Sequence, residues 1–433
     1  MPKIIKNKSL LAKTRQRKIA LEIVEAGLAA IQTEAVLSQK VKLVGNQLRI
    51  NGRQFNLNDY QKIGFLGIGK CAFKSARFFE KLLKAKLCGG VVIDISGGRL
   101  KKIKSFIGSH PLPSAKNIVA TKAAIRFVKS LDPEKDLLIM VISGGGSSLF
   151  FSPVGISLKD FQSLTLDLQK SKADIYKLNT VRKHLSLVKG GKLAKIIYPL
   201  KTIGLVFSDV IGDDLSFIAS GPLVLDKTTN EQAKKVLQQY GLWQRYKGKI
   251  AEFSETPKDK KYFKNIQNFL ILNNQTALQA MANKAKQLGL KPKILTDKLS
   301  CLNFNAFQAI RTRAKKFKNH NLFLAGGETK VNIIGKGKGG RNLEAALAGL
   351  VQIKPNELFL AFASDGIDNT DFAGGVSDTL ALLEAKKLGL KIKEYLKDND
   401  SYNFFKQIGD YLKTGPTGSN VSDLMLYYKT NRE

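Results

Sequence analysis

The stretch GFLGIGKC, from Gly64 to Cys71, opens the most regular part of the sequence. Written as G-x-x-x-x-G-K-[ST], it is a P-loop in which Cys71 replaces the hydroxyl residue that binds Mg²⁺. Written as G-x-G-x-x-[GA], with Gly67, Gly69 and Ala72, it is a dinucleotide fingerprint. A tight turn with no ligand is the simpler interpretation. All three share one consequence for the fold: a strand runs through a glycine turn into a helix.

Similar patterns continue on both sides of this stretch. The apolar run LLIMVI, residues 137–142, has the length of a buried strand and leads into SGGGSS, and the strand patterns GGVVIDIS and TIGLVFSDV are separated by helical patterns. This alternation predicts a Rossmann-like parallel sheet with right-handed crossovers. A second α/β series begins near residue 269, after a polar, Lys-rich segment. We therefore expect an N-terminal α/β domain (1–240), a linker or surface excursion (241–268) and a C-terminal α/β domain (269–433).

Length and composition agree with two domains. The chain has 433 residues, of which 43% are hydrophobic, and this is too long for one ordinary core. No apolar run approaches the roughly 20 residues of a membrane span, and no signal peptide is visible. The three cysteines match neither a disulfide framework nor a zinc spacing. A cytoplasmic protein without a membrane partner is the expectation.

The chain is strongly basic, with 71 Lys and Arg against 35 Asp and Glu and a net charge of +36. These residues are spread along the sequence, and no basic stripe interleaved with aromatic residues is present. A solvated Lys-rich surface is the favoured interpretation, and an anionic metabolite would benefit from the same field. Nucleic-acid binding remains the less favoured alternative.

Three motifs in the first half can carry chemistry. The turn Ser143–Ser148 lets the backbone approach an anion closely. Asn179–Ala194 gathers Arg182, Lys189 and other basic residues, although a solvated basic helix would look the same. Asp209 follows a strand pattern, where a carboxylate can bind Mg²⁺ or accept a hydroxyl proton.

The second half of the chain also combines glycine turns, basic residues and strand-end carboxylates. Glu328 follows a strand and two glycines, and Arg341 begins a helix after the glycine-rich segment 335–340, so that Arg and helix amides predict a phosphate clamp. Acidic residues recur every three positions in ASDGIDNTDFAGG, from Asp365, which excludes the EF-hand spacing. The turn GPTGSN ends at Asn420.

A dehydrogenase is the main rival class. Asp94 lies 25 residues after Gly69, near the position of a ribose-binding acid. However, a dehydrogenase needs one glycine fingerprint, whereas this chain has at least four glycine turns at strand ends with charged residues beside them. Several anion sites with strand-end carboxylates suit a polyphosphate donor, Mg²⁺ and an anionic acceptor.

Eight motifs, in order, carry a family resemblance: GIGKCA, GSHPLPSA, ISGGGSSLF, NTVRKHLSLVKGGKLA, FSDVIGDDLSFIASGP, GGETKV with GKGGRNLEAAL, ASDGIDNTDFAGG and GPTGSN. The set resembles the glycerate 2-kinase (MOFRL-type) family, some members of which are labelled hydroxypyruvate reductase. The resemblance covers about residues 15–427. It implies ATP- and Mg²⁺-dependent phosphorylation of D-glycerate to 2-phosphoglycerate, with the active site in a cleft between two α/β domains. An NAD(P)H-dependent hydroxypyruvate reductase is the alternative.

The resemblance also implies roles for residues. Lys70 and Arg341 neutralise the phosphoryl group and the glycerate carboxylate, and Asp209 orients or deprotonates the 2-hydroxyl or binds Mg²⁺, with Glu328 as a second metal candidate. The residues assigned to the binding of substrate or phosphate are Gly67, Gly69, His110, Ser143, Gly144, Gly145, Gly146, Ser147, Arg182 and Lys189. Nucleotide is assigned to Gly327, Glu328, Gly339, Gly340, Asp365 and Asn420. GFLGIGKC is then a phosphate-type turn that supplies Lys70, neither a Walker loop nor an NAD fingerprint. The oligomeric state is open, with a homodimer as one option.

Overall fold

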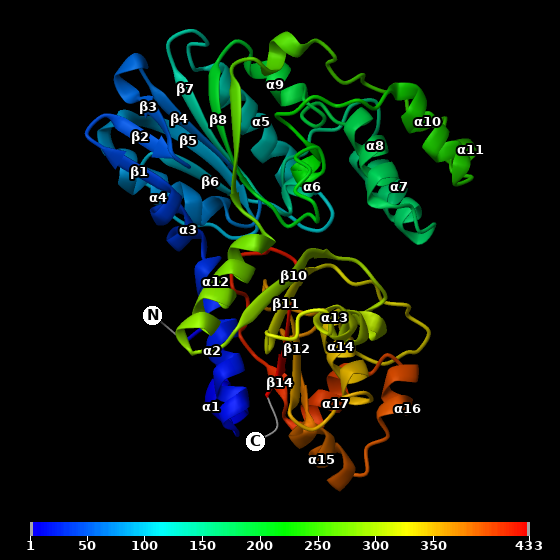
Figure 1. Ribbon diagram of the computed structural model, residues 1–433. Coiled ribbons are helices and arrows are strands. Elements are labelled where there is room, and N and C mark those ends of the chain that lie inside the picture. The colour runs from blue at the N-terminus through cyan, green and yellow to red at the C-terminus, as the bar shows by residue number, and fades with distance from the viewer. Residues whose placement is uncertain (1–2, 431–433) are drawn as a thin grey trace. The chain divides into compact units, whose positions relative to one another are not determined.

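The computed structural model describes residues 3–430, and its contacts divide the chain into two compact units (Figure 1). One unit is the continuous stretch Val36–Ile271, which we call the middle unit. The other combines Met1–Ala35 with Leu272–Glu433, and we call it the terminal unit. This division differs from the expected ranges mainly in the first 35 residues, which the contacts place with the C-terminal part of the chain.

A six-stranded sheet forms the centre of the middle unit, in the order β6-β5-β4-β7-β8-β9. The pairs β5–β6, β4–β5, β4–β7 and β7–β8 are parallel. This confirms the Rossmann-like sheet that the alternating patterns predict. The strands are β4 (Ile63–Ile68), β5 (Leu87–Asp94), β6 (Ile103–Ile107), β7 (Leu137–Ile142), β8 (Lys201–Phe207) and β9 (Ile266–Leu272).

The strand order of this sheet reverses between β4 and β7. From β4 the chain moves to β5 and then to β6 on one side, and it later returns to place β7 on the other side of β4. Ligands of open α/β sheets bind at such switch points, beyond the carboxyl ends of the strands. The two glycine turns that follow β4 and β7 are therefore neighbours at the position where this fold favours a site.

Helices cover both faces of the sheet. Leu66 and Ile68 of β4 belong to a core that includes residues of α5 (Ala115–Lys129) and α9 (Lys192–Ile197). Phe65, which points the other way, contacts Phe79 of α4 (Ala72–Leu83), with ring centroids 5.4 Å apart. Every residue of β4 and β7 is consequently buried.

The segment 241–268, expected as a linker or surface excursion, packs into the middle unit. It contains α11 (Trp243–Tyr246) and the start of β9. Tyr246 is 0% exposed, and its hydroxyl donates to Asp167 Oδ2 at 2.7 Å. This core also includes residues from α7 (Leu158–Lys170), α8 (Ile175–His184) and α10 (Asn230–Gln239).

A small antiparallel sheet precedes the main sheet of the middle unit. Its strands are β1 (Val41–Val44), β2 (Gln47–Ile50) and β3 (Arg53–Asn56). The turn between β1 and β2 is at Gly45-Asn46.

The terminal unit has a mixed six-stranded sheet in the order β10-β11-β15-β12-β13-β14. Only β10 and β11 are parallel among the reported pairs, and the last strand, β15, lies between β11 and β12. The strands are β10 (Pro292–Leu299), β11 (Leu322–Gly327), β12 (Glu357–Ala363), β13 (Gly374–Asp378), β14 (Tyr411–Leu412) and β15 (Asp423–Lys429). The helices are α1 (Lys8–Leu11), α2 (Arg15–Ala30), α12 (Asn274–Gln287), α13 (Ala306–Ala314), α14 (Arg341–Leu350), α15 (Thr379–Lys387), α16 (Ile392–Lys397) and α17 (Ser401–Ile408), while α3 (Thr33–Lys40) crosses the boundary between the units.

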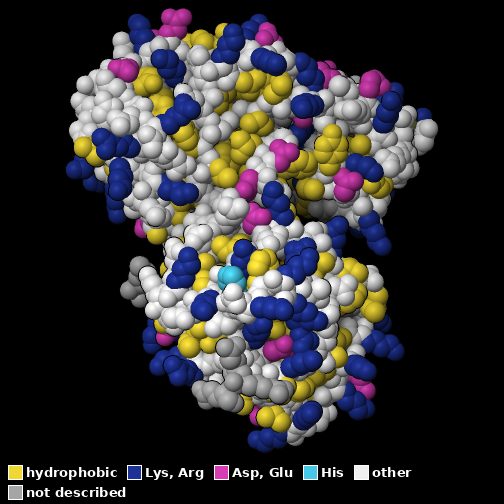
Figure 2. Space-filling model, in the orientation of Figure 1, with side chains coloured by type: hydrophobic (Ala, Val, Ile, Leu, Met, Phe, Trp, Pro, Cys, Tyr) yellow, Lys and Arg dark blue, Asp and Glu magenta, His cyan; other side chains and the backbone are white. Residues whose placement is uncertain are grey.

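Lys and Arg side chains are scattered over both units on the face that Figure 2 shows, as the even spread of basic residues along the sequence predicts. None of the helices in residues 3–430 combines the length and the apolar character needed to cross a membrane.

A buried ion-pair cluster joins α2 to the C-terminal part of the terminal unit. The Arg17 guanidinium, 1% exposed, donates to both oxygens of Asp378 at 2.7 Å, and to both oxygens of Asp410 at 2.6 and 3.0 Å. Helix α2 also packs on α12 so closely that a Cβ atom at Gly27 would lie 2.6 Å from Met281 Cγ. These contacts explain why the first 35 residues belong to the terminal unit.

We expect Arg17→Met to destabilise the terminal unit by about 3–5 kcal/mol, because it removes the buried guanidinium that Asp378 and Asp410 share and leaves Asp378 without a counter-ion. Lys13→Met is the matched control, since Lys13 also pairs with Asp410 but its side chain is 46% exposed; it should cost at most about 1 kcal/mol. Urea unfolding followed by circular dichroism measures both. Equal stability losses in the two variants would contradict this account.

Candidate active site

The turns after β4 and β7 are joined directly. The amide of Lys70 donates to the carbonyl oxygen of Gly144 at 2.9 Å, and the amide of Ser143 donates to Ile68 O at 3.0 Å. Gly69 has φ +109°, and a Cβ atom there would lie 2.2 Å from Ser143 Oγ. Only glycine fits this position, so the second glycine of GIGKC serves the contact between the turns.

The turn after β4 has no amides left for a phosphate. The amides of Gly69, Cys71 and Phe73 donate to Ile93 O, Ser143 Oγ and Asp94 Oδ2, at 3.1, 3.3 and 2.9 Å. Lys70 N is taken by Gly144, as described, and Gly67 is buried within β4. The geometry therefore gives Gly67 and Gly69 a packing role, in contrast to the predicted phosphate contact. The contribution of this turn is the Lys70 side chain.

Asp94, the proposed ribose-binding acid, is also engaged. It is 1% exposed and accepts hydrogen bonds from the amides of Phe73, Ile95 and Ser96 at 2.9, 2.6 and 3.3 Å. Its carboxylate anchors the start of α4 to the end of β5. The carboxylate of Asp94 and the amides of the β4 turn are therefore both engaged within the protein, which argues against the dinucleotide-binding interpretation.

The turn after β7 does offer amides. Gly145, with φ +83°, precedes the short helix α6 (Gly146–Leu149). Within residues 3–430, the amides of Gly144, Gly145 and Ser147 have no hydrogen-bond acceptor. Ser143 and Gly146 have structural roles, because Ser143 Oγ binds the β4 turn and a Cβ atom at Gly146 would lie 2.5 Å from Ala219 Cβ. Within the predicted anion-binding turn, Ser143–Ser148, the backbone amides of Gly144, Gly145 and Ser147 therefore remain available as donors.

Three further side chains surround this turn. A Cβ atom at Gly144 would lie 2.0 Å from Asp209 Oδ2, so the Asp209 carboxylate packs against the turn. A Cβ atom at Gly145 would lie 3.1 Å from Lys70 Cγ and 3.3 Å from His110 Cδ2. We call Lys70, His110, Gly144, Gly145 and Asp209 the switch-point site. The segments that follow β4, β6, β7 and β8, each predicted separately, thus converge on one site.

His110 is held neutral at this site. Partial desolvation and the charge of Lys70 lower the pKa of the imidazole to about 4. A neutral imidazole at physiological pH can donate or accept one hydrogen bond without adding a third charge beside Lys70 and Asp209.

The basic motif Asn179–Ala194 is mostly structural. Lys189, 0% exposed, donates to the carbonyl oxygens of Ser147 and Phe150 at 2.5 and 2.9 Å. Lys189 therefore supports the turn after β7 from behind, and its predicted contact with substrate stays a prediction. Lys183 pairs with Asp226 at 2.9 Å. Arg182 is different, because no hydrogen bond or ion pair engages it in the part of the chain that the structure describes.

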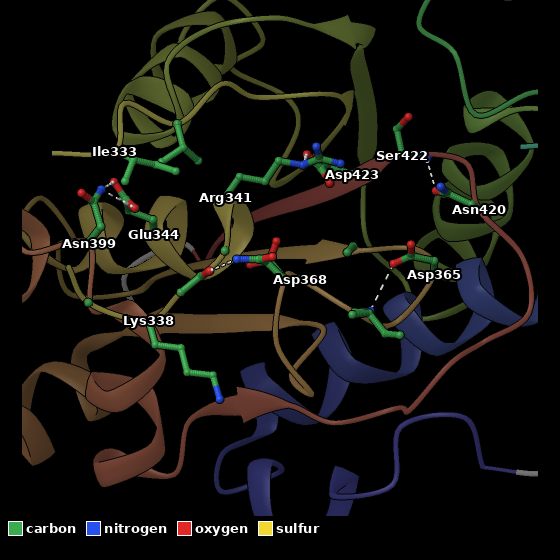
Figure 3. Close-up of a pocket in the computed structure, with 17 residues that line it drawn as sticks. Ile333, Lys338, Arg341, Glu344, Asp365, Asp368, Asn399, Asn420, Ser422 and Asp423 are labelled. Atoms are coloured by element: carbon green, nitrogen blue, oxygen red, sulfur yellow. Dashed lines mark hydrogen bonds and ion pairs between the residues drawn. The ribbon is translucent and has the colours of Figure 1, made fainter. Parts of the chain in front are cut away.

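The terminal unit contains a pocket of about 660 Å³ (Figure 3). Its walls come from the segment 331–344, the loop after β12 and the start of β15. Gly339, Gly340, Arg341, Asp365 and Asn420 line it, as does Lys338, which the sequence analysis did not single out.

Arg341 begins α14 and is held by two carboxylates. Its Nη1 pairs with Glu328 Oε1, and its Nε lies 2.7 Å from Asp423 Oδ2. The Asp423 side chain is fully buried, and burial raises the pKa of its carboxyl to about 7. The Glu328 side chain is 48% exposed. The two partners of Arg341 therefore differ sharply in their access to solvent.

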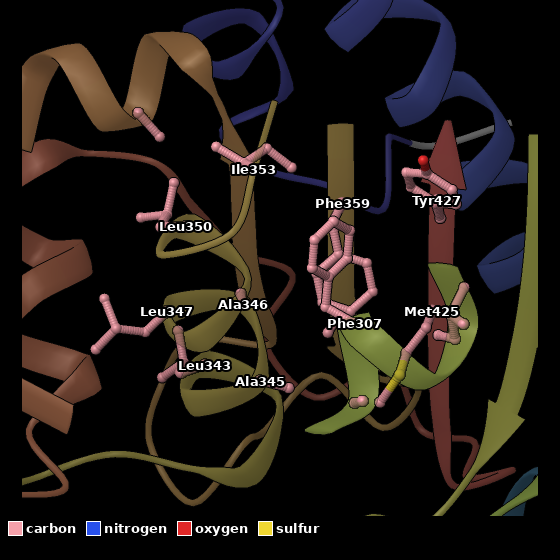
Figure 4. Packing of buried hydrophobic residues seen from close by; sticks show 14 of the residues in the cluster. Phe307, Leu343, Ala345, Ala346, Leu347, Leu350, Ile353, Phe359, Met425 and Tyr427 are labelled. Atoms are coloured by element: carbon pink, nitrogen blue, oxygen red, sulfur yellow. The ribbon is translucent and has the colours of Figure 1, made fainter. Parts of the chain in front are cut away.

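The amino end of α14 is already capped. Asp368 Oδ2 accepts from the amides of Asn342 and Leu343 at 3.0 and 2.7 Å. The predicted clamp of Arg and helix amides is therefore incomplete, because an internal carboxylate takes the amides. Leu343 and Leu347 fix the helix in the core, which also contains Phe307, Phe359 and Tyr427 (Figure 4).

The glycine-rich segment before α14 is pinned to the turn 398–400. Gly335 N donates to Asn399 Oδ1 and Lys338 N to Asp400 Oδ1, both at 2.9 Å. Among the described residues, the amides of Gly339, Gly340 and Arg341 have no acceptor. An anion would meet free amides at this end of the segment, next to Lys338.

The other predicted nucleotide residues divide into two groups. Asp365 and Asn420 line the pocket, whereas a Cβ atom at Gly327 would lie 2.2 Å from Leu299 O, which gives Gly327 a packing role. Ile333 and Ile367, missed from the sequence, line the same pocket and are 76% and 46% exposed. Exposed apolar side chains at a polar pocket suit the face of a base.

The comparisons match these features along the chain. Residues 19–255 match the family described as a domain of unknown function (DUF4147), and residues 321–423 match the MOFRL family. The chain is 37% identical to a glycerate 2-kinase of Pyrococcus horikoshii, over 96% of this chain and 98% of that protein. It is also 37% identical to a D-glycerate 2-kinase of Thermotoga maritima, over 95% and 97%. The chain belongs to the glycerate 2-kinase family.

A solved glycerate kinase of Thermotoga maritima has the same fold, with a TM-score of 0.82, 33% identity, and coverage of 95% of this chain and 99% of that chain. In this member of the glycerate 2-kinase family, Lys70, His110 and Asp209 lie close together in the middle unit. Arg341, Asp365 and Asn420 line the pocket of the terminal unit.

Asp368, Asp423 and Lys338 are the main site residues that sequence reasoning missed. Asp368 is the second acid of the three-residue series that starts at Asp365, and that spacing was the available signal. Asp423 begins a strand and Lys338 stands among many lysines, so neither had a distinguishing pattern.

We expect the His110 imidazole to stay neutral from pH 8 to about pH 5 in an NMR titration, since its pKa lies near 4. Lys70→Met should raise this pKa, because the repelling charge is removed. Lys81→Met, an exposed change on α4, the helix that follows the Lys70 turn, is the control and should leave the titration unchanged. A wild-type midpoint near that of free histidine, about 6.5, would contradict the assignment.

Proposed function

We propose that this protein catalyses ATP- and Mg²⁺-dependent phosphorylation of D-glycerate to 2-phosphoglycerate. The observation that carries the proposal is the full-length match to glycerate 2-kinases, combined with two anion-adapted sites on separate units. We assign the acceptor to the switch-point site and the nucleotide to the terminal-unit pocket. The location of the active site in a cleft between domains stays a prediction.

The switch-point site can position and activate a hydroxyl group. Asp209 packs against the turn that offers the Gly144 and Gly145 amides, so it can orient the acceptor hydroxyl and accept its proton. Lys70 supplies positive charge for the phosphoryl group in transfer. His110, neutral, can hydrogen-bond the acceptor without changing the local charge.

The terminal-unit pocket can hold the nucleotide. Lys338, Arg341 and the amides of Gly339 and Gly340 form its anion-binding end. Ile333 and Ile367 supply apolar surface for the base. Asp365 and Asn420 provide polar contacts in the same pocket.

The residues present fit a metal that arrives with the nucleotide. In residues 3–430, no group of three or more His, Cys, Asp or Glu side chains could hold a metal ion alone. Mg²⁺ commonly keeps its waters and binds one or two carboxylates together with substrate phosphates. Asp365, at the pocket, is the carboxylate we assign to it, and Asp209, at the acceptor, stays the alternative metal ligand. When bound, the ion neutralises phosphate charge.

The hydroxypyruvate reductase alternative loses its support, because Asp94 and the amides of the β4 turn are engaged within the middle unit. The expected cytoplasmic location, the homodimer and the absence of a nucleic-acid partner stay predictions.

Incubation with D-glycerate, ATP and Mg²⁺, followed by NMR of the product, tests the function. We expect phosphate on the 2-hydroxyl. Lys70→Met, purified identically, should lower kcat on the order of 10³-fold, because charge stabilisation of the transferred group is lost, and it guards against a contaminating kinase. Phosphate on the 3-hydroxyl, or NADH oxidation with hydroxypyruvate and no phosphorylated product, would refute the proposal.

Glu328→Gln separates two roles for this carboxylate. As the solvent-exposed partner of Arg341, it competes with phosphate, so we expect the KM for ATP to fall roughly two- to fivefold, the range for a partly exposed ion pair. As a metal ligand, its loss would instead lower kcat and raise the Mg²⁺ requirement. Glu394→Gln, which removes an exposed pair with Lys391, is the matched control and should change neither constant.

A further inference from the structure

Arg182 lies in the last turn of α8 and is only partly accessible to solvent. Its neighbours on the helix are fully satisfied: Lys183 pairs with Asp226, and His184 contacts Asn230 Oδ1 at 2.8 Å and Thr228 Oγ1 at 3.1 Å. Within residues 3–430, the Arg182 guanidinium has no acceptor at all. Burial without a counter-ion lowers its pKa to about 10. A guanidinium presents five N–H donors, so this is a large unmet capacity.

A second basic side chain lies in the same region. Lys189 is 0% exposed and its amino group contacts two carbonyl oxygens, those of Ser147 and Phe150. Burial and the nearby charge of Arg182 both lower the pKa of Lys189. Because neither group has a carboxylate partner, a positive charge on both at once is unfavourable unless an anion binds nearby.

Hydrogen bonds connect helix α8, one turn before Arg182, to the turn after β7. Ser147 Oγ lies 2.9 Å from Ser220 Oγ, and Ser220 Oγ donates to Asn179 Oδ1 at 3.1 Å. Asn179 is three residues before Arg182, on the same side of α8. The positive region therefore adjoins the turn whose Gly144, Gly145 and Ser147 amides are free.

We infer that Arg182 binds the carboxylate of the acceptor, so that the enzyme selects short hydroxy acids over neutral polyols. The acceptor carries a single anionic group before transfer, and a guanidinium matches a carboxylate with two parallel hydrogen bonds. Lys189 stands behind the turn and does not touch the ligand. The identity of the acceptor rests on the proposed function, whereas the need for an anion rests on the unpaired Arg182 guanidinium alone.

The test compares Arg182→Met and Arg182→Lys with a matched control, Arg245→Met, which removes an Arg whose side chain is 62% exposed and pairs with Asp167. Isothermal titration with D-glycerate, without nucleotide, measures binding. We expect the Kd to rise about 10- to 100-fold in Arg182→Met, the range for a lost charged hydrogen bond. Arg182→Lys should fall between, because it keeps the charge but not the fork. Arg245→Met should match wild type.

Stability distinguishes a ligand site from a structural role. Without glycerate, the Tm of Arg182→Met should stay unchanged or rise, because the variant removes a buried charge that has no partner. The rise in Tm that we expect glycerate to cause in wild type should be lost in this variant. With ATP and Mg²⁺, the KM for glycerate should rise while the KM for ATP stays constant, and the preference for glycerate over glycerol should shrink.

Three results would overturn the inference: a glycerate Kd in Arg182→Met within threefold of wild type, no glycerate binding by wild type, or a lowered Tm in both Arg182 variants without ligand. Failure of the proposed function looks different. Wild type would then bind glycerate through Arg182 but transfer no phosphate to it, and the carboxylate site would stand.

Discussion

The hydrogen bond from Lys70 N to Gly144 O is the contact on which the middle unit depends. It joins the turns after two neighbouring parallel strands at the point where the strand order reverses. Gly69 lies against Ser143 with no space for a side chain. The two turns therefore pack tightly against each other as well as sharing this hydrogen bond. The joint leaves the Lys70 side chain and the amides of the second turn facing one region, and it brings Asp209 and His110 beside them.

Charge compensation distinguishes structure from function in both units. Two buried cations pair with buried carboxylates: Arg17 contacts two of them and Lys183 contacts one. Such groups specify the fold, because removal of one leaves its partners buried and unsatisfied. Arg182 lacks a partner and Arg341 has one that is half exposed. Both guanidinium groups therefore have capacity for a ligand.

Much of this arrangement could be predicted from the sequence. The glycine turns predicted the strand ends, and Lys70, Asp209, Asp365 and Asn420 lie at strand-end sites because each follows or adjoins a short apolar run that reads clearly as a strand. Register and topology then bring separate strand ends together.

What failed is the assignment of individual donors. A sequence shows that Gly67, Gly69 or Lys189 could meet an anion, but it does not show whether a protein acceptor is already there. Ser143 Oγ, Asp94 and Asp368 take amides that the motifs offered to phosphate, and each comes from a part of the chain distant from the motif it satisfies. The membership of residues 1–35 was missed for the same reason, since its cause is a contact between Arg17 and carboxylates more than 360 residues away.

That long separation has a consequence for synthesis on the ribosome. The middle unit is continuous, so all its strands have emerged before the terminal unit is complete. Helix α2 is translated first, yet the acids that neutralise its Arg17 are translated almost last. The nascent chain must therefore carry an amphipathic helix with an unsatisfied guanidinium until translation ends, and release of the finished polypeptide becomes the event that lets its two ends close on each other.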